Sequence, residues 1–225
     1  MSDSCVLMFT KPAVPGRVKT RLIGELSPDD AADLHQAFLS DLRRRLKEGS
    51  FALRLAWDLE ADETIPPGMA PSFPQEGATL GDRLYRGLTR VVGDHAYVAA
   101  VGSDHPELPL ARVETAFQWL RNGADVVLGP ASDGGYYLIG TRRETLHPRL
   151  FEEIPWSTAE VLARTENRIA ELGLEARLLP AGEDVDTPAD LRNLADRIRR
   201  EEPDDLPATT AILRRIGFLE EEVEP

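Results

Sequence analysis

Short apolar runs alternate with stretches of helical periodicity along most of this chain, and this alternation constrains its fold more than any other feature. Runs that fit buried strands cover residues 5–10, 51–57, 96–101, 125–128, 135–140 and 176–180. Helical patterns cover residues 28–48, 80–92, 110–121, 158–172, 188–200 and 208–216. Alternating strands and helices pack as a mainly parallel sheet between two helical layers. The sequence therefore predicts an α/β protein with three layers, α/β/α.

Local signals mark some boundaries of these elements. Ser27 and Pro28, followed by two acidic residues, are typical of a helix start, and Gly49 is expected to end that helix. The Pro- and Gly-rich residues 65–74 predict a long loop. Acidic residues 220–224 form a predicted tail.

The balance of charge limits the partners of the protein. The 225-residue chain has a formal net charge of −13, which argues against a nucleic-acid groove, so an anionic substrate needs a local basic patch. The lone cysteine, Cys5, cannot form an intrachain disulfide, which favours a reducing compartment. We find no secretory signal and no apolar stretch long enough to cross a membrane. A cytoplasmic protein is expected.

Aspartates follow two of the predicted strands. Asp104 comes after residues 96–101, and Asp184 and Asp186 come after residues 176–180. Open α/β sheets bind ligands outside the carboxyl ends of their strands, where two carboxylates can hold a hard divalent cation. A proline follows each cluster, and capping of the next helix is the commoner role for either aspartate alone. Their placement at two strand ends favours a shared cation site.

A basic loop follows the first predicted strand. It runs from Lys11 to Arg21 and contains Gly16, Arg17 and Lys19. Glycine lets the backbone approach a phosphate closely, and the cations can neutralise its charge. The spacing matches neither a Walker A loop nor a dinucleotide-binding motif. A solvated basic turn is the alternative, but the position of the loop in an acidic protein favours a phosphate site.

Two further phrases contain candidate site residues. Residues 133–135, Asp-Gly-Gly, separate two apolar runs, so they form either a hairpin turn or a space for a sugar or other acceptor. In the second case Asp133 would bind the acceptor or act as a general base. Residues 156–158, Trp-Ser-Thr, are equally open: Ser157 caps the next helix or contacts a ligand, and Trp156 packs in the core or stacks on a ligand.

The phrases at residues 9–22, 102–106, 129–140, 154–158 and 184–191, with a weaker match at 75–84, occur in an order that resembles the bacterial DUF2064 family. These proteins are related to glycosyltransferases. The resemblance covers most of residues 5–195 and implies a GT-A fold, the type of nucleotide-diphospho-sugar transferases and nucleotidylyltransferases. It also implies one such nucleotide-binding domain over residues 1–200. Residues 201–225, predicted as a C-terminal helix and acidic tail, lie outside the resemblance and are assigned no role.

The resemblance further implies roles for individual residues. Asp104 and Asp186 would hold Mg²⁺ or Mn²⁺, and Asp133 and Asp104 would be catalytic. His105 departs from the family pattern, since relatives often have a smaller residue there, and its imidazole would narrow the site or add a donor near the metal. The implied nucleotide- and phosphate-binding residues are Lys11, Gly16, Arg17, Lys19, Arg21, Gln75 and Arg83. The implied acceptor- or sugar-binding residues are Gly134, Gly135, Tyr136, Trp156, Ser157 and Thr158.

Two transferase reactions suit this scaffold. The resemblance favours a glycosyltransferase that moves a sugar from a nucleoside-diphosphate sugar to a small acceptor. The basic loop suits the alternative, a nucleotidylyltransferase that joins a nucleoside monophosphate from a triphosphate to a phosphorylated substrate and releases pyrophosphate. An inactive nucleotide-binding module is a third possibility, but Asp104, Asp133 and Asp186 weigh against it.

Overall fold

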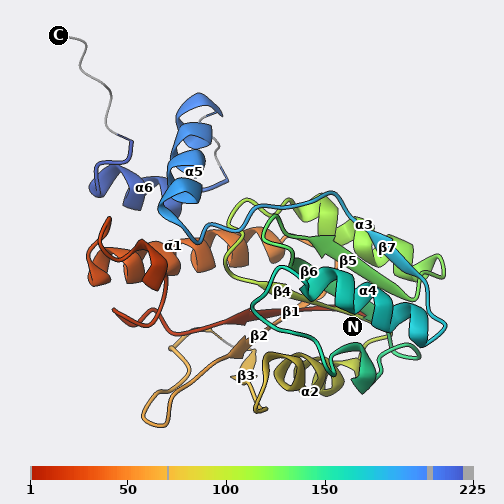
Figure 1. The fold of residues 1–225 in the computed structure, drawn as a ribbon. Coiled ribbons are helices and arrows are strands. Elements are labelled where there is room, and N and C mark those ends of the chain that lie inside the picture. The colour runs from red at the N-terminus through yellow and green to blue at the C-terminus, as the bar shows by residue number, and fades with distance from the viewer. Residues whose placement is uncertain (1, 70, 202–204, 220–225) are drawn as a thin grey trace.

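The computed structural model describes residues 2–69, 71–201 and 205–219, and over these ranges seven strands form one sheet (Figure 1). In spatial order they are β3 (Ser72–Pro74), β2 (Ala52–Trp57), β1 (Ser4–Thr10), β4 (Tyr97–Gly102), β6 (Tyr136–Arg142), β5 (Val126–Pro130) and β7 (Ala176–Leu178). Neighbouring strands are parallel except at β6, which is antiparallel to both β4 and β5. The predicted mainly parallel sheet is confirmed.

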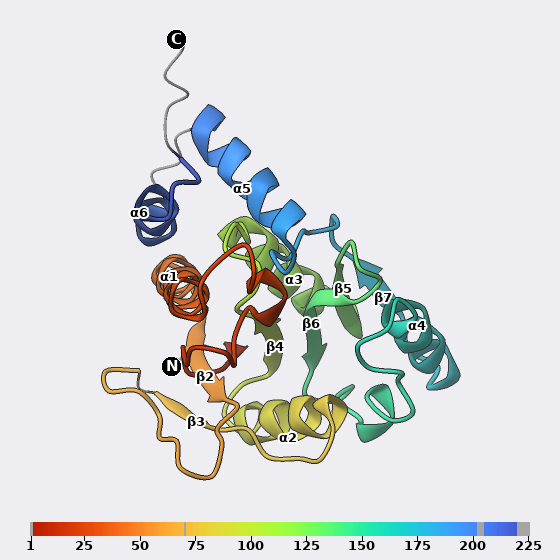
Figure 2. The same cartoon turned by 60° about the vertical axis from the view of Figure 1, so that its left-hand side comes forward.

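Helices cover both faces of the sheet (Figure 2). Val6 and Met8 of β1 pack with α1 (Pro28–Leu46) and α3 (Leu110–Arg121). Cys5 and Leu7 pack on the opposite side with α2 (Leu80–Val92), and that core extends to α4 (Val161–Glu171). Successive side chains of a strand point to opposite faces, so β1 supplies both cores. The three-layer α/β/α arrangement is confirmed.

Capping contacts fix the starts of the first two helices. The Ser27 hydroxyl accepts a hydrogen bond from the Asp30 amide at 3.0 Å, with Pro28 in the first turn of α1, as predicted. Thr79 and Asp82 form a reciprocal capping box at the start of α2. The capping box holds the first turn of α2 in place, and that turn lies at the carboxyl ends of the central strands.

The hairpin between β5 and β6 is tightly constrained. The Ala131 amide donates to the Gly135 carbonyl at 3.0 Å, which closes the turn. Gly134 has a φ of 88°, and a Cβ there would lie 2.3 Å from the Ala159 carbonyl oxygen. Only glycine fits such a position without moving the backbone. The hairpin expected from the Asp-Gly-Gly phrase is therefore present, and Asp133 lies at its tip.

Two more helices lie beside α1, away from the sheet (Figures 1 and 2). They are α5 (Pro188–Glu201) and α6 (Pro207–Arg215), and their apolar faces share a third core with Leu34 and Phe38 of α1. The buried Asp41 carboxylate accepts from the amides of Ala208 and Thr209 at 3.1 and 2.8 Å, which caps α6. The predicted acidic tail at 220–224 lies outside the described residues.

Some predicted boundaries were wrong. Residues 65–74 contain a short edge strand, β3, because Phe73 and its neighbours pair with the end of β2. The helix predicted from residue 158 begins at Val161, since Ser157 has a φ of 64° and Thr158 bonds back to the Pro155 carbonyl at 2.7 Å. The strand predicted to reach residue 180 ends at Leu178. Short 3-10 helices, η1 (Thr20–Leu22) and η2 (Pro148–Leu150), complete the described elements.

Candidate functional site

A cleft lies at the carboxyl ends of β1 and β4. From β1 the sheet extends to β2 and β3 on one side, and from β4 to the other strands on the opposite side. Open α/β sheets bind ligands at such a switch point. The cleft has a polar chamber of about 610 Å³ and an apolar chamber of about 250 Å³. The two chambers share the lining residues Phe9, Leu80, Gly102 and Ser157.

Ionisable side chains line the polar chamber. Its carboxylates are Asp58, Asp104 and Asp186, and its cations are Lys11, Arg17, Lys19, Arg21 and Arg83. The cations outnumber the carboxylates although the chain as a whole carries a formal charge of −13. The lining of the polar chamber is therefore richer in cations than in carboxylates, which a protein of this charge needs in order to hold an anion.

Lys19 lies between the two aspartates predicted to share a cation. Its Nζ donates to Asp186 Oδ1 at 3.1 Å, to the Val185 carbonyl at 2.8 Å, and to Asp104 Oδ1. The Lys19 side chain is only 2% exposed. Burial opposes its charge, but Asp104 and Asp186 outweigh that effect and raise the pKa of Lys19. A positive charge thus already lies between the two carboxylates that the sequence assigned to a metal.

Neither of these carboxylates caps a helix, which removes the alternative left open by the sequence. Helix α3 begins after Pro109, with no capping side chain, five residues beyond Asp104. At the start of α5, Asp190 accepts from the Thr187 amide at 2.8 Å, and the Thr187 hydroxyl accepts from the Asp190 amide at 3.3 Å. This capping box uses Asp190 and Thr187, so Asp186 is free to face the chamber.

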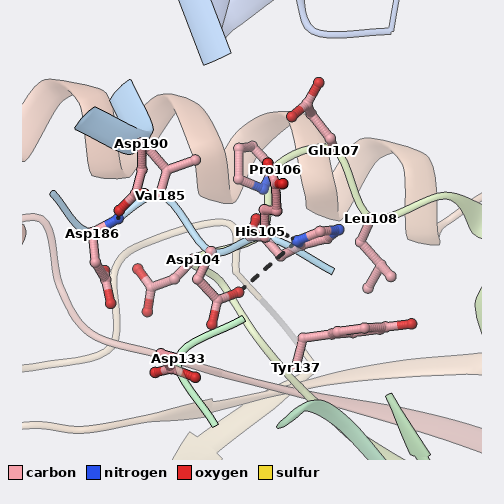
Figure 3. Close-up of polar contacts among 12 residues, drawn as sticks. Asp104, His105, Pro106, Glu107, Leu108, Asp133, Tyr137, Val185, Asp186 and Asp190 are labelled. Carbon is pink, nitrogen blue, oxygen red and sulfur yellow. Dashed lines mark hydrogen bonds and ion pairs between the residues drawn. The ribbon is translucent and has the colours of Figure 1, made fainter. Parts of the chain in front are cut away.

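His105 joins the two loops that carry these aspartates. Its Nδ1 donates to the Glu183 carbonyl at 2.6 Å, and its ring stacks on Tyr137 at a centroid distance of 5.1 Å (Figure 3). Burial lowers the pKa of His105 to about 4, so the imidazole is neutral near pH 7. The Val185 amide adds a bond to the Asp104 carbonyl at 2.9 Å. His105 therefore positions the loops rather than supplying charge.

Further carboxylates converge beside Asp104 and Asp186. Figure 3 shows Asp133 on the same side of the loop, reaching this region from the β5–β6 hairpin. Burial, followed by the charges of Asp104 and Asp186, raises the pKa of Asp184 to about 7. Asp133 and Asp184 line the apolar chamber, and Asp104 and Asp186 line the adjoining polar chamber. The sequence phrases 102–106, 133–135 and 184–186 thus form one spatial cluster.

The donor set suits a hard divalent cation that also binds phosphate. Within the described ranges, no three carboxylate, imidazole or thiolate side chains are arranged to hold a metal on their own. Mg²⁺ commonly uses one or two protein carboxylates and completes its octahedron with phosphate oxygens and water. Asp104 and Asp186 supply that number of oxygen ligands. Bringing a metal between them requires that Lys19 shift from its present contacts.

The other predicted phosphate-binding residues differ in placement. Arg17 pairs with Glu60 at 2.9 Å and also with Glu63. Asp58 holds two cations, Lys11 at 3.5 Å and Arg83 at 2.7 Å. Four of the five lining cations are thus paired with carboxylates, although Glu60 and Glu63 are not among the lining residues, and Arg21 lines the chamber as well.

Gln75 and Gly16 have structural contacts of their own. The Gln75 amide nitrogen donates to the carbonyls of Thr10 and Ala56 at 3.3 and 3.0 Å, so it ties together the ends of β1 and β2. Gln75 also lines the polar chamber. Gly16 forms the turn of the basic loop with a φ of 80°, outside the residues that line either chamber.

The apolar chamber is built by the sheet, by helices α2 and α4 on one of its faces, and by the loop before α4. Tyr136 and Trp156 meet edge to face at 6.3 Å, and Gly135 and Thr158 lie beside them. The rest of its wall is Phe9, Leu80, Leu84, Ala100, Val101, Gly102, Tyr137, Ile139, Ser157 and Val161, with Asp133 and Asp184 as its carboxylates. Ser157 does not cap α4, whose N-cap is Glu160 with no side-chain bond. Gly134, also predicted to bind the acceptor or sugar, does not line the chamber and packs against Ala159.

Among the lining residues that sequence reasoning missed, three bear on the chemistry of the cleft. Asp58 follows β2, and the strand-end reasoning used for Asp104 would have found it. His35 is buried on α1, where its Nε2 lies 3.1 Å from the Lys11 carbonyl, and burial lowers its pKa. Leu80 is a large apolar residue that is 44% exposed at the start of α2. No local sequence signal marks His35 or Leu80, because only the tertiary structure brings them to the cleft.

The family model described as "Uncharacterized protein conserved in bacteria (DUF2064)" matches residues 42–158. The chain belongs to the DUF2064 family. The chain is similar to a solved structure from Desulfovibrio desulfuricans that is described as a candidate nucleotide-diphospho-sugar transferase. The two are 32% identical, with 97% of each chain covered and a TM-score of 0.89. The predicted fold of nucleotide-diphospho-sugar transferases is thereby confirmed for this DUF2064 protein.

More distant structures share the fold. A CMP:2-keto-3-deoxy-manno-octonic acid synthetase in complex with CTP is 15% identical, covers 89% of this chain and 100% of its own, and has a TM-score of 0.56. A Mycobacterium tuberculosis protein in complex with manganese is 16% identical, with coverages of 86% and 98% and a TM-score of 0.50. The search of curated proteins gives no match. Over its described residues, this DUF2064 chain has no helix that is both long and apolar enough to cross a bilayer.

Proposed function

We propose that this DUF2064 protein is a metal-dependent glycosyltransferase that moves a sugar from a nucleoside-diphosphate sugar to a small acceptor. The observation that supports this most directly is the two-part cleft, in which the polar chamber and the apolar chamber meet beside Asp104, Asp133 and Asp186. A donor with a charged and an uncharged part would fit across that junction. The 32% identical relative, itself described as a candidate nucleotide-diphospho-sugar transferase, supports the same class.

In this proposal the donor diphosphate occupies the polar chamber. Lys19, Arg17 and Arg21 extend from the loop after β1 and would neutralise its charge. Lys11 and Arg83, both held by Asp58, would keep the far wall positive. The neutral imidazole of His105 holds the Asp104 and Asp186 loops together while the diphosphate binds between them.

Asp104 and Asp186 would hold Mg²⁺ or Mn²⁺, which would supply positive charge to the departing diphosphate. The acceptor hydroxyl oxygen attacks the anomeric carbon of the sugar, and the bond from that carbon to the diphosphate oxygen breaks. Asp133 would take the hydroxyl proton, since its carboxylate lies on the hairpin that faces the junction, where it also accepts from the Gly135 amide at 2.9 Å. The products are the glycosylated acceptor and a nucleoside diphosphate.

Nucleotide binding is tested first, by thermal denaturation of the full chain with UDP, GDP and TDP, each with and without Mn²⁺. A ligand that binds only the native state raises the apparent stability, so we expect one diphosphate to raise the Tm in a metal-dependent manner. Asp104→Asn should remove this increase. The control is Asp94→Asn, an exposed aspartate near the opposite end of β4.

Turnover separates the possible reactions. The nucleotide that binds is supplied as its sugar conjugate and, separately, as its triphosphate, with a panel of alcohols and sugar phosphates. Release of nucleoside diphosphate supports glycosyl transfer. Release of pyrophosphate identifies the nucleotidylyltransferase, which the cationic loop after β1 favours because a triphosphate carries more charge than a diphosphate. Metal-dependent binding without either product indicates a nucleotide-binding module.

A further inference from the structure

We infer that the acceptor of this transferase is an uncharged alcohol or phenol with an apolar or aromatic body, and that it binds in the apolar chamber beside Asp133. This inference rests on the proposed function, because it takes the polar chamber as the place of the donor diphosphate. It narrows the acceptor to one chemical class and excludes phosphorylated small molecules. The chemistry of the chamber wall favours this class of acceptor.

Positive charge is missing from that wall. Among the described residues, no lysine, arginine or histidine lines the apolar chamber, whereas five cations line the polar chamber next to it. The acidic side chains that the apolar chamber does contain are those of Asp133 and Asp184. A phosphate or carboxylate placed there would be desolvated with no cation to balance its charge. An anionic acceptor is therefore strongly disfavoured.

The wall is instead suited to an apolar surface. Leu84, Ala100, Ile139 and Val161 close it from the sheet and from two helices, and the Trp156 indole lies edge to face with Tyr136. Burial of apolar or aromatic area is the interaction that such a wall provides.

Leu80 at the mouth of the chamber supports this view. It is 44% exposed, which makes it one of the few large apolar side chains of the described chain that face solvent. It also lines both chambers, so an acceptor entering beside the donor would cover it. An apolar acceptor would remove this surface from water, whereas a charged acceptor would gain nothing from it.

The few polar side chains of the apolar chamber show where the hydroxyl of the acceptor would bind. Asp133 and Ser157 lie on two different loops around the chamber, and Ser157 also lines the polar chamber. Tyr137 is not available for this purpose, because its hydroxyl donates to the Pro180 carbonyl at 3.0 Å. The Thr158 hydroxyl likewise donates to the Pro155 carbonyl at 2.7 Å, so the wall offers Ser157 and the carboxyl groups of Asp133 and Asp184. These groups can bind a few hydroxyls rather than a whole sugar ring, which favours an acceptor with a single reactive hydroxyl.

Binding of benzyl alcohol, benzyl phosphate and glycerol to the full chain tests this inference without turnover. The readout is tryptophan fluorescence, with Trp156→Phe as the variant that removes the reporter in the chamber but keeps an aromatic ring. We expect benzyl alcohol to change the emission of the wild type but not of Trp156→Phe, and to bind about tenfold or more tightly than either other probe, since a tenfold ratio needs only ~1.4 kcal/mol. Equal or tighter binding of benzyl phosphate, or no response to benzyl alcohol, overturns the inference.

A charge placed at the mouth provides a second test. Leu80→Arg adds a cation at an exposed position and should raise the affinity for benzyl phosphate relative to benzyl alcohol. The matched control is Leu178→Arg, another exposed leucine, on β7 and outside both chambers, which should keep the wild-type preference. An unchanged preference in Leu80→Arg counts against the inference.

The binding experiments distinguish failure of the proposed function from failure of the acceptor inference. If UDP, GDP and TDP all fail to bind with Mn²⁺ while benzyl alcohol is still preferred, the proposed function is wrong and the chamber chemistry stands. If a nucleotide binds and benzyl phosphate is preferred, the acceptor inference is wrong. That result would favour nucleotidyl transfer to a phosphorylated substrate.

Discussion

The polar and apolar chambers both open at the carboxyl ends of the central strands, but different parts of the structure form their walls. The polar chamber is formed mainly by loops that follow β1, β2 and β4, and its contacts are ion pairs such as those of Lys19 with Asp104 and Asp186. The apolar chamber is formed by side chains from the sheet, α2, α4 and the hairpin tip. Charge therefore selects the ligand in the first chamber, and apolar surface selects it in the second.

This difference predicts that each chamber can be disabled without the other. Charge removal should abolish nucleotide binding and spare the acceptor, while removal of apolar surface should do the reverse. Asp104→Asn, Lys19→Met and Trp156→Ala test this separation, and Cys5 tests the strand beneath the chambers.

The largest effect is expected for Asp104→Asn. The substitution removes one of the two carboxylates that suit a divalent cation and leaves an amide of nearly the same shape. Metal-dependent affinity for the nucleoside diphosphate should fall by about a hundredfold or more, because even groups that only support metal ligands contribute about ten- to a hundredfold. Calorimetric titration in Mn²⁺ measures this. Benzyl alcohol binding should not change, and an equal loss there would mean that the two chambers are coupled.

Lys19→Met tests what balances the carboxylates of the polar chamber. With the ammonium gone, Asp104 and Asp186 face each other without their shared partner, so the free energy of unfolding should drop by ~2 kcal/mol. Added Mn²⁺ should raise the Tm of this variant more than that of the wild type, because a cation can then enter without displacing Lys19. Equal shifts in both proteins would contradict a shared position for metal and ammonium.

Trp156→Ala tests the apolar chamber. Loss of the indole should weaken acceptor binding by about tenfold, or ~1.4 kcal/mol, while the affinity for the nucleotide stays the same. Separate determination of KM for the acceptor and Kd for the nucleotide distinguishes the two chambers. Trp119→Ala, at a tryptophan stacked under Arg177 and outside both chambers, is the control. A matching loss of nucleotide affinity would contradict the division.

The smallest effect is expected at Cys5, in the strand that supplies the floor of both chambers. Cys5 is fully buried, and burial raises the pKa of its thiol to about 11, so the reactive thiolate is scarce below that pH. A disulfide reagent at pH 8 should therefore leave the folded protein unlabelled and label it after denaturation. Labelling should increase as the pH approaches 11. Fast labelling at pH 8 would show that the sheet opens below the chambers.

Much of the architecture was predictable from local patterns. The alternation of apolar runs and helical segments gave the three layers, and the ranges 80–92 and 110–121 match α2 and α3. Capping at Ser27 was also recognisable, because it depends on residues three positions apart. The edge strand β3 was missed because it forms by pairing with β2, not through its own composition. Ser72 pairs with Leu55, which is 17 positions away in the sequence.

The cleft was predictable only in outline. Strand-end reasoning placed Asp104 and Asp186 in one crevice, and the Asp-Gly-Gly phrase separately made Asp133 a candidate; the structure brings their loops together. It did not foresee that Thr187 and Asp190 would take the capping role from Asp186, nor that His105 would turn inward onto Tyr137. These outcomes depend on competition between neighbouring side chains for the same amides and the same space, which spacing alone does not resolve.

By itself, the sequence determined the class of fold and the strand ends at which polar residues gather, because hydrophobic periodicity and turn chemistry act over a few residues. The tertiary structure alone decided that Lys19 meets Asp104 and Asp186, which are 85 and 167 positions away. It also decided that a wall without cations stands beside them, since that wall is drawn from β1, α2, β4, β6 and the loop before α4. Contacts of such separation arise from packing, so the chemistry of the acceptor side became visible only once the layers were assembled.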